Sequence, residues 1–438
     1  MIGYWKRKML LSWDRWSRRR QRVARVLAAR WRRRLIFLLG GVGVGAVAVG
    51  FTKLADLAQL EFNRLLGHWP YACLVVTPAG FALCTYLATR YFPNSQGSGI
   101  PQAIAARQMA DHESRRRLVS IRLAVGKVLL TVIGLLCGAS IGREGPTVQV
   151  GASLMFAAGH MSPRRQPGLI LAGASAGVAA AFNTPLAGIV FGIEEMGRSF
   201  EARTSGLAIA AVLAAGITSI AFLGDYLYFG TTGVFIGSFA GWLAAPVCGI
   251  IGGSLGGLFS RCLVLFAHGL PGRLGGWLKA NPVLFALICG LGVALCGLAS
   301  GGSIFGTGYA QAKGLLEGTG AVPGSFGLWK LAATVLSAVS GIPGGIFSPS
   351  LAAGAGIGAS MASLFPGVPV GAIVLLGMVS YFTGVVQAPI TAFVIVTEMT
   401  NDHAMLVPLM AAAFIAHGAS RLICKEGVYH ALAANYRR

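Results

Sequence analysis

Long apolar stretches with few charged residues follow one another along almost the whole chain. They are residues 35–60, 71–90, 118–142, 168–194, 205–223, 238–268, 282–300, 327–361, 368–398 and 404–420. Most of them are long enough to cross a hydrocarbon core of ~30 Å as α-helices. The pattern therefore predicts an all-α polytopic membrane protein.

The composition excludes a soluble protein of this size. Of the 438 residues, 55% are hydrophobic and only 11% are charged, and the mean hydropathy is +0.69. This is far more apolar than a typical soluble domain. The 63 glycines would weaken helices in water, whereas small residues in membrane helices allow close packing.

One set of residues occurs twice at a fixed spacing. The set Lys127, Thr131, Val132, Gly138, Gly142, Pro146, Gly151 and Ala152 recurs 203 positions later as Lys330, Thr334, Val335, Gly341, Gly345, Pro349, Gly354 and Ala355. Gly97–Gly99 resembles Gly306–Gly308, and both halves reach a Pro followed by Glu195-Met196 or Glu398-Met399. The pattern predicts two transmembrane repeats, residues 35–223 and 224–433, whose Gly and Pro interruptions mark the binding site.

Residues 1–34 form a basic arm with thirteen Lys/Arg and one acid, Asp14, in a chain of net charge +22. Tryptophans interleave with the basic residues, as in some nucleic-acid-binding arms: Trp5, Trp13, Trp16 and Trp31. Because a membrane span follows at once, we expect instead a cytoplasmic helix on anionic lipid, with no nucleic-acid partner.

The same charge bias predicts the orientation in the cell (inner) membrane. Both termini are expected in the cytoplasm, including a short tail at 434–438. Further cytoplasmic residues would be Arg115, Arg116, Arg117, Arg198, Arg203, Arg421, Lys425, Arg437 and Arg438. Arg164 and Arg165 are expected outside, as an exception to the bias.

No enzyme or metal motif is found. The eight cysteines show no CxxC spacing and are expected as buried thiols, and the seven histidines show no ligand spacing. There is no HExxH, P-loop or GxSxG. An intramembrane hydrolase would need a nucleophile paired with a base, and Ser98 has no nearby His or Lys in the sequence. We therefore expect neither enzyme activity nor a cofactor.

The segment Gly97-Ser98-Gly99-Ile100-Pro101 predicts a helix N-terminus at the end of an apolar stretch. Glycine on both sides gives a sharp turn, Ser can cap the helix, and Pro suits its first turn. Free backbone N–H groups at such a position attract an anion. An ordinary N-cap is the alternative interpretation.

A second helix start is predicted at Gly142-Arg143-Glu144-Gly145-Pro146. A carboxylate near mid-membrane costs about 2.5–3.5 kcal/mol unless it is compensated. The helix N-terminus would compensate Glu144, which lies where an anion would bind. A protonatable side chain that competes with a permeant anion would couple the two. The alternative is an Arg143–Glu144 salt bridge in a surface loop.

The repeat partner of this segment contains Gly345, Ile346, Phe347 and Ser348, and the 203-residue spacing places Phe347 where the first half has Glu144. We therefore expect Glu144 and Phe347 to converge on one site from helix N-termini near mid-membrane. A fourth candidate is the acidic pair Glu194-Glu195, which ends an apolar helix. It is interpreted either as a plain interfacial helix end or as a proton acceptor at the cytoplasmic mouth.

The blocks G97SGIP, G142REGP and G345IFSP make the sequence closely resemble the CLC family of chloride channels and chloride/proton antiporters. The likeness covers about residues 35–433. It implies two inverted repeats of tilted and partial helices, in a homodimer with one anion pathway per subunit. The chain ends soon after Tyr429, as in the compact prokaryotic members.

The resemblance also implies roles for single residues. Glu144 would be the external gate, Glu195 the internal proton acceptor, and Glu194 would line its water access. Lys127 would be the family's buried lysine, which raises the electrostatic potential around the pathway, and Arg143 would support the site. Chloride would be bound by the Ser98 and Tyr429 hydroxyls and by the backbone at Gly99, Ile100, Gly145, Ile346 and Phe347. Ser at position 98 would favour chloride, since nitrate-preferring plant relatives in the family usually have Pro there. Gln102 departs from the family, which commonly has an acid there, and should alter packing rather than selectivity.

The resulting prediction is a chloride/proton antiporter whose substrates are chloride and protons. The alternative within the same class is a passive chloride channel gated by voltage or pH, against which the presence of both glutamates argues. A third hypothesis is a basic scaffold that acts through the arm and uses the membrane part as an anchor.

Overall fold

The computed structural model describes residues 2–159, 165–197, 202–224, 228–320 and 322–437. Arg164, Arg198 and Arg438 lie outside the described residues, and so do the side chains of residues 2–19 and of Arg203. Throughout the described ranges the secondary structure is helical, with two isolated β-bridges and no strand.

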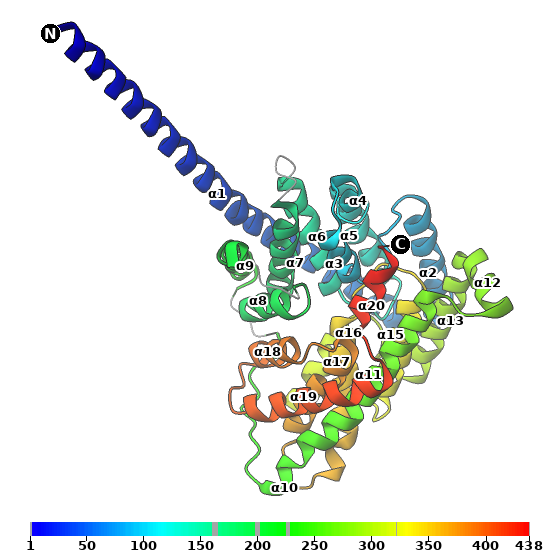
Figure 1. Ribbon diagram of the computed structural model, residues 1–438. Helices are drawn as coiled ribbons and strands as arrows, with labels where there is room; N and C mark the ends of the chain where they lie inside the picture. The colour runs from blue at the N-terminus through cyan, green and yellow to red at the C-terminus, as the bar shows by residue number, and fades with distance from the viewer. Residues whose placement is uncertain (1, 160–164, 198–201, 225–227, 321, 438) are drawn as a thin grey trace.

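Within the described residues, the first half of the chain contains nine α-helices (Figure 1). They are α1 (Ile2–His68), α2 (Cys73–Arg90), α3 (Ile100–Gln108), α4 (His112–Arg116), α5 (Ile121–Leu136), α6 (Glu144–Ala158), α7 (Gln166–Phe182), α8 (Pro185–Glu194) and α9 (Ala202–Leu223), with the 3-10 helix η1 (Pro70–Ala72) between α1 and α2.

The second half contains the remaining described helices. They are α10 (Phe239–Trp242), α11 (Ala244–His268), α12 (Gly272–Ala280), α13 (Pro282–Ala299), α14 (Tyr309–Glu317), α15 (Phe326–Val339), α16 (Phe347–Met361), the 3-10 helix η3 (Ala362–Leu364), α17 (Val370–Val386), α18 (Pro389–Thr400), α19 (Leu406–Ile423) and α20 (Val428–Asn435). The last helix, α20, returns to pack against α3 of the first half (Figure 1).

The two halves repeat the same series of helices, as the sequence predicted. Helices α2 and α3 match α13 and α14 at a spacing of 209 residues, and α6 matches α16 at 203. Helices α7 and α8 match α17 and α18 at 204, so one extra residue enters the second half between α16 and α17. This shift corrects the predicted alignment of Glu398, whose counterpart is Glu194 rather than Glu195.

Besides residues 238–268, which contain the short α10 and the long α11, three of the long apolar stretches each contain two α-helices rather than one. Residues 168–194 form α7 and α8, 327–361 form α15 and α16, and 368–398 form α17 and α18. The breaks at Asn183 and Gln387 are left-handed, with φ of 59° and 61°, and each stands two residues before the Pro that begins the next helix. Left-handed Asn ends one helix and Pro suits the start of another.

Seven helices of the described residues are long and apolar enough to cross a membrane by length and composition, and five further apolar helices are shorter. Helix α17 is apolar all round and buried from Gly371 to Val386, so it lies at the centre of the second half. Helices α1, α9 and α13 carry exposed Leu and Ile side chains that suit contact with lipid. The chain is a multi-pass membrane protein.

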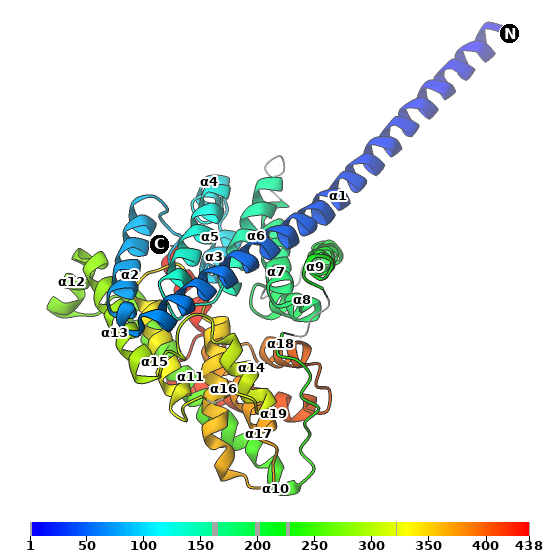
Figure 2. The ribbon, with the colours of Figure 1, turned by 180° about the vertical axis from the view of Figure 1, so that it is seen from behind.

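The basic arm and the first apolar stretch form one continuous helix, α1, without a break at residue 34. Its N-terminal part extends away from the rest of the protein in both views (Figures 1 and 2). No Gly or Pro lies between residues 4 and 39, so nothing in the sequence interrupts helical hydrogen bonding there.

Arg165 corrects one prediction about sidedness. Its neighbour Gln166 accepts a hydrogen bond from Arg115 at 3.1 Å, and Arg165 lines a small cavity together with Arg32 and Arg33 of the basic arm. Arg165 therefore lies on the same side of the protein as these basic residues, and not on the opposite side. The charge bias has no exception at this residue.

Candidate functional site

The three glycine-rich blocks meet at one point. Gly142 and Gly345 exchange two backbone hydrogen bonds of 2.7 Å, and Gly344 donates to the Gly97 carbonyl at 3.0 Å. A Cβ at Gly145 would lie 2.9 Å from the Ser98 carbonyl oxygen and 3.2 Å from Gly345 Cα. Only glycine at position 145 lets the three turns approach so closely. The meeting of the second and third blocks was predicted from their repeat spacing.

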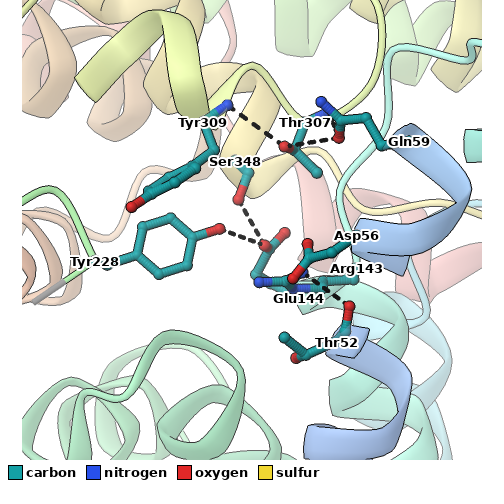
Figure 3. Close-up of polar contacts among 9 residues, drawn as sticks. All are labelled: Thr52, Asp56, Gln59, Arg143, Glu144, Tyr228, Thr307, Tyr309 and Ser348. Carbon is teal, nitrogen blue, oxygen red and sulfur yellow. Dashed lines mark hydrogen bonds and ion pairs between the residues drawn. The ribbon is translucent and has the colours of Figure 1, made fainter. Parts of the chain in front are cut away.

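Glu144 is the first residue of α6 and is fully buried. Its Oε1 accepts a hydrogen bond from the Ser348 hydroxyl at 2.6 Å and a longer one from the Tyr228 hydroxyl at 3.4 Å. Figure 3 shows both hydroxyls directed at the carboxylate. Since Ser348 belongs to α16, Glu144 joins the starts of the two matching helices, and its predicted proximity to Phe347 is confirmed.

Arg143 does not form the surface salt bridge with Glu144 that was the alternative interpretation. Its guanidinium instead pairs with Asp56 of α1 and donates to the Thr52 carbonyl at 3.3 Å (Figure 3). Arg143 is buried, whereas the Asp56 side chain is 64% exposed. Asp56 thus lies at the surface, whereas Glu144 is fully buried and does not lie in a surface loop.

Ser98 and Tyr429 are far apart in the sequence but lie close together in the structure. Tyr429 of α20 is fully buried, and its phenol lies near the side chains of Ser98, Glu144 and Glu195. Its ring lies 5.8 Å from the ring of Phe347. The Ser98 hydroxyl accepts a hydrogen bond from the Ile100 amide at 3.2 Å, so it also caps α3.

Three helices, α3, α6 and α16, begin around this point. Gly99 precedes α3 in a left-handed conformation, with φ of 96°, and Ile346 precedes α16. The first backbone N–H groups of a helix, such as those of Ile100 and Phe347, lack acceptors inside the helix and carry partial positive charge. Their convergence, with the hydroxyls of Ser98 and Tyr429 nearby, favours a small anion.

Two buried lysines support the turns before the short helices. Lys127 donates to the carbonyls of Ser95 at 2.6 Å and Gly97 at 2.7 Å. Lys330 donates in the same way to Ile304 at 2.8 Å and Gly306 at 2.7 Å. Both side chains are fully buried. Lys127 thus holds the Ser98 turn, while its predicted electrostatic effect on the pathway stays a prediction.

Gln102, the departure from the family pattern, lies behind the same turn. Its amide donates to the carbonyls of Asn94 at 3.2 Å and Gln96 at 2.7 Å. A carboxylate at this position has no proton to donate when ionised, so the amide changes how the turn is held.

Glu195 ends α8 and is only 3% exposed. Its Oε1 lies 3.7 Å from Nε2 of His430, the residue after Tyr429. Arg107 of α3 donates to the neighbouring Met196 carbonyl at 2.7 Å. Glu195 is therefore held where α3, α8 and α20 meet.

Glu194 joins the two halves. Its carboxylate accepts hydrogen bonds from the amides of Ile390 at 3.1 Å and Thr391 at 2.6 Å, at the start of α18. Glu398 at the end of α18 accepts from Leu186 at 3.1 Å and Ala187 at 2.8 Å, at the start of α8. Each helix therefore caps the other, which requires the two helices to run antiparallel. The role of Glu194 in water access stays a prediction.

Cavities lie on both sides of the site. One of about 360 Å³ is lined by Asp56, Arg143, Tyr228 and Thr307. The other, of about 520 Å³, is lined by Ser98, Lys279 and Tyr436, among others. Two cavities with different linings therefore adjoin the site.

Several site residues escaped prediction from the sequence. Ser348 lies within the third block, but no role was assigned to it. Tyr228 and Asp56 lie 84 and 87 positions from their partners in the second block, and neither has a local signature. Among the described residues no three His, Cys, Asp or Glu side chains are grouped for a metal ion. The eight cysteines are free thiols, six of them buried.

Comparisons with known proteins agree with this geometry. The chain matches the voltage-gated chloride channel family over residues 79–421 and therefore belongs to the CLC family. It is 31% identical to the H(+)/Cl(−) exchange transporter ClcA of Yersinia pseudotuberculosis serotype IB (strain PB1/+), covering 95% of this chain and 91% of that protein. It is 30% identical to ClcA of Klebsiella pneumoniae (strain 342), over 84% and 81% of the two chains.

Solved structures share the fold. A slow cyanobacterial Cl−/H+ antiporter superimposes with a TM-score of 0.80 at 22% identity, covering 92% of this chain and 97% of that one. A CLC-type fluoride/proton antiporter gives 0.75 at 25% identity, covering 89% and 95%.

Proposed function

We propose that this protein exchanges chloride for protons across the membrane. The observation that carries the proposal is the fully buried carboxylate of Glu144 at the start of α6, beside the start of α16. An ionised carboxylate there takes the place of an anion. The ClcA relatives, named as exchange transporters, and the presence of a second buried acid, Glu195, support exchange rather than passive flow.

The proposed mechanism follows from competition for one position. Ionised Glu144 and chloride repel each other, so chloride at the helix starts favours protonation of Glu144. The neutral side chain then leaves the anion pathway, and its proton is available for transfer to the other side. Glu195 accepts protons on that side, and Ser98 and Tyr429 hold chloride between the two acids.

The proposed orientation places the larger cavity in the cytoplasm of a bacterial cell, with the protein in the inner membrane. Basic residues gather on that side, as the positive-inside rule favours. They include Arg115, Arg116 and Arg117 around α4, Arg273 and Lys279 on α12, and Arg437 near the C-terminus. Both termini would then be cytoplasmic.

We further propose a homodimer, which the family resemblance implies. Helices α8, α9, α18 and α19 expose apolar side chains over neighbouring parts of the surface: Leu186, Ile217, Ile390 and Val407. The mass of the purified protein in detergent, corrected for bound detergent, tests this; the mass of one chain would contradict it.

Reconstitution into liposomes tests the function. With a chloride gradient imposed, chloride and internal pH are recorded together. An exchanger moves protons uphill against their own gradient, driven by chloride. Chloride flux with no proton movement would indicate a channel and would overturn the proposal. Removing residues 1–30 should leave exchange intact, whereas a scaffold acting through its arm would show no transport in either form.

A further inference from the structure

We propose that His430 is the proton-transfer residue that connects Glu195 to the cytoplasm. The proposal rests on the proposed exchange function and names the residue at the cytoplasmic end of its proton route. Glu195 has only 4% of its side chain exposed, whereas His430, 3.7 Å away, has 19% exposed. The imidazole is therefore the more accessible of the two groups.

The position of His430 on α20 separates it from the cavity of about 520 Å³ that is lined by Ser98. Leu432, Asn435 and Tyr436 line that cavity and share one face of the helix, since residues three and four apart are neighbours. His430 is about 200° around the helix axis from Leu432 at 3.6 residues per turn. Protons that arrive through His430 therefore use a different face of α20 from the chloride that approaches Ser98.

The chemistry fits a proton relay. An imidazolium at His430 gives its Nε2 proton to Oε1 of Glu195: the N–H bond breaks, an O–H bond forms, and the imidazole is left neutral. A hydronium ion from the cytoplasm then returns a proton to the ring and is left as water. The 3.7 Å separation exceeds a hydrogen bond, so one of the two side chains must move by about 1 Å for the proton to transfer directly. Histidine is suited to this step because it titrates between about pH 5 and 8.

Other ionisable groups surround the pair. Arg107 of α3 reaches the residue next to Glu195, at the Met196 carbonyl. Helices α11 and α17 also contact α20, and their ionisable residues are Cys248, Arg261, Cys262, His268 and Tyr381. On α8, Glu194 is engaged with the amides of α18. On α20 itself, Tyr429 and Tyr436 are phenols.

The test compares His430→Gln with His268→Gln, an exposed histidine on α11, in the full-length protein in liposomes. Chloride flux and chloride-driven proton flux are measured at cytoplasmic-side pH 5 to 8. His430→Gln should keep chloride flux and lose about 10-fold or more of proton flux at neutral pH, because positioned proton transfer contributes on the order of 10²–10⁴-fold. The control should match the wild type.

Chemical rescue separates proton transfer from a structural role. Imidazole added on the His430 side should restore proton flux to His430→Ala and leave Glu195→Gln unchanged. Equal loss of chloride and proton flux without rescue, or a wild-type pH profile in His430→Gln, would overturn this proposal. If the wild type itself moves no protons, the exchange function has failed instead, and the two failures are thereby distinguished.

Discussion

The two halves of the chain share the groups that hold the backbone. Lys127 and Lys330 are buried at matching positions, and each binds the carbonyls of the turn before a short helix. Glu194 and Glu398 also match, and each caps a helix of the opposite half. These two pairs are duplicated, so the scaffold is symmetric about the site.

The acids expected to carry protons are present in the first half only. Glu144 matches Phe347 at the spacing of 203 residues that relates α6 to α16. Glu195 matches Met399 at the spacing of 204 residues that relates α8 to α18. Phe347 packs instead in an aromatic cluster with Phe182. The comparison teaches that the repeat provides the two helix starts, whereas departures from the repeat provide the proton chemistry.

The largest effect is expected from Glu144→Gln. This variant makes position 144 uncharged, like the matching Phe347 of the second half. The amide cannot titrate, so chloride should move passively, without a response to a pH gradient and without proton counterflow. Paired chloride and pH recordings in liposomes measure this. Glu113→Gln, an exposed acid on α4, is the control and should behave as the wild type. Retained pH-dependent exchange in Glu144→Gln would remove Glu144 as the gate.

Removing the second unmatched acid should have a narrower effect. Glu195→Gln should keep chloride flux and lose chloride-driven proton pumping, because an amide cannot accept a proton from the cytoplasm. The same recordings detect the difference. If the variant still acidifies or alkalinises liposomes like the wild type, protons enter through another group, and Glu194 is the next candidate.

A several-fold change in selectivity is expected at the first turn. Ser98 and Thr307 occupy matching turns, and each hydroxyl accepts a hydrogen bond from the amide two residues later, at 3.2 and 3.4 Å. Only Ser98 adjoins Tyr429. Ser98→Pro should therefore shift preference from chloride toward nitrate, whereas Thr307→Pro should not. Relative flux of the two anions measures this, and an unchanged ratio in Ser98→Pro would count against a role in binding.

The smallest effect is expected at the two matching helix caps, Glu194 and Glu398. Glu194→Ala and Glu398→Ala each remove the cap of one helix, which costs about 1–2 kcal/mol. Because the contacts are equivalent, the two variants should lower the free energy of unfolding by similar amounts, measured in detergent. Destabilisation by only one of them would show that the caps are not equivalent in energy.

The sequence was sufficient for the fold class and for the site at the helix starts. The spacing of Gly and Pro placed Glu144 beside the start of α16 because repeated segments fold alike. Local signals failed where one residue changes the spacing: the alignment of Glu398 with Glu195 did not allow for the extra residue between α16 and α17.

Contacts between distant segments could not be predicted. Asp56 replaces Glu144 as the ion-pair partner of Arg143 through the packing of α1 against α6. The sidedness of Arg165 likewise depends on its neighbour Gln166, which bonds Arg115 across 51 positions. Hydrophobic pattern and charge bias contain no information about such pairings.

The reciprocal capping of α8 and α18 has a consequence for the origin of the chain. A contact that is the same from either side is isologous, like the contact across a two-fold axis between identical subunits. A half-length ancestor that inserted into the membrane in both orientations would form this capping contact between two copies of opposite orientation. Gene duplication and fusion would then preserve the contact without new interactions, leaving each half free to diverge at Glu144 and Glu195.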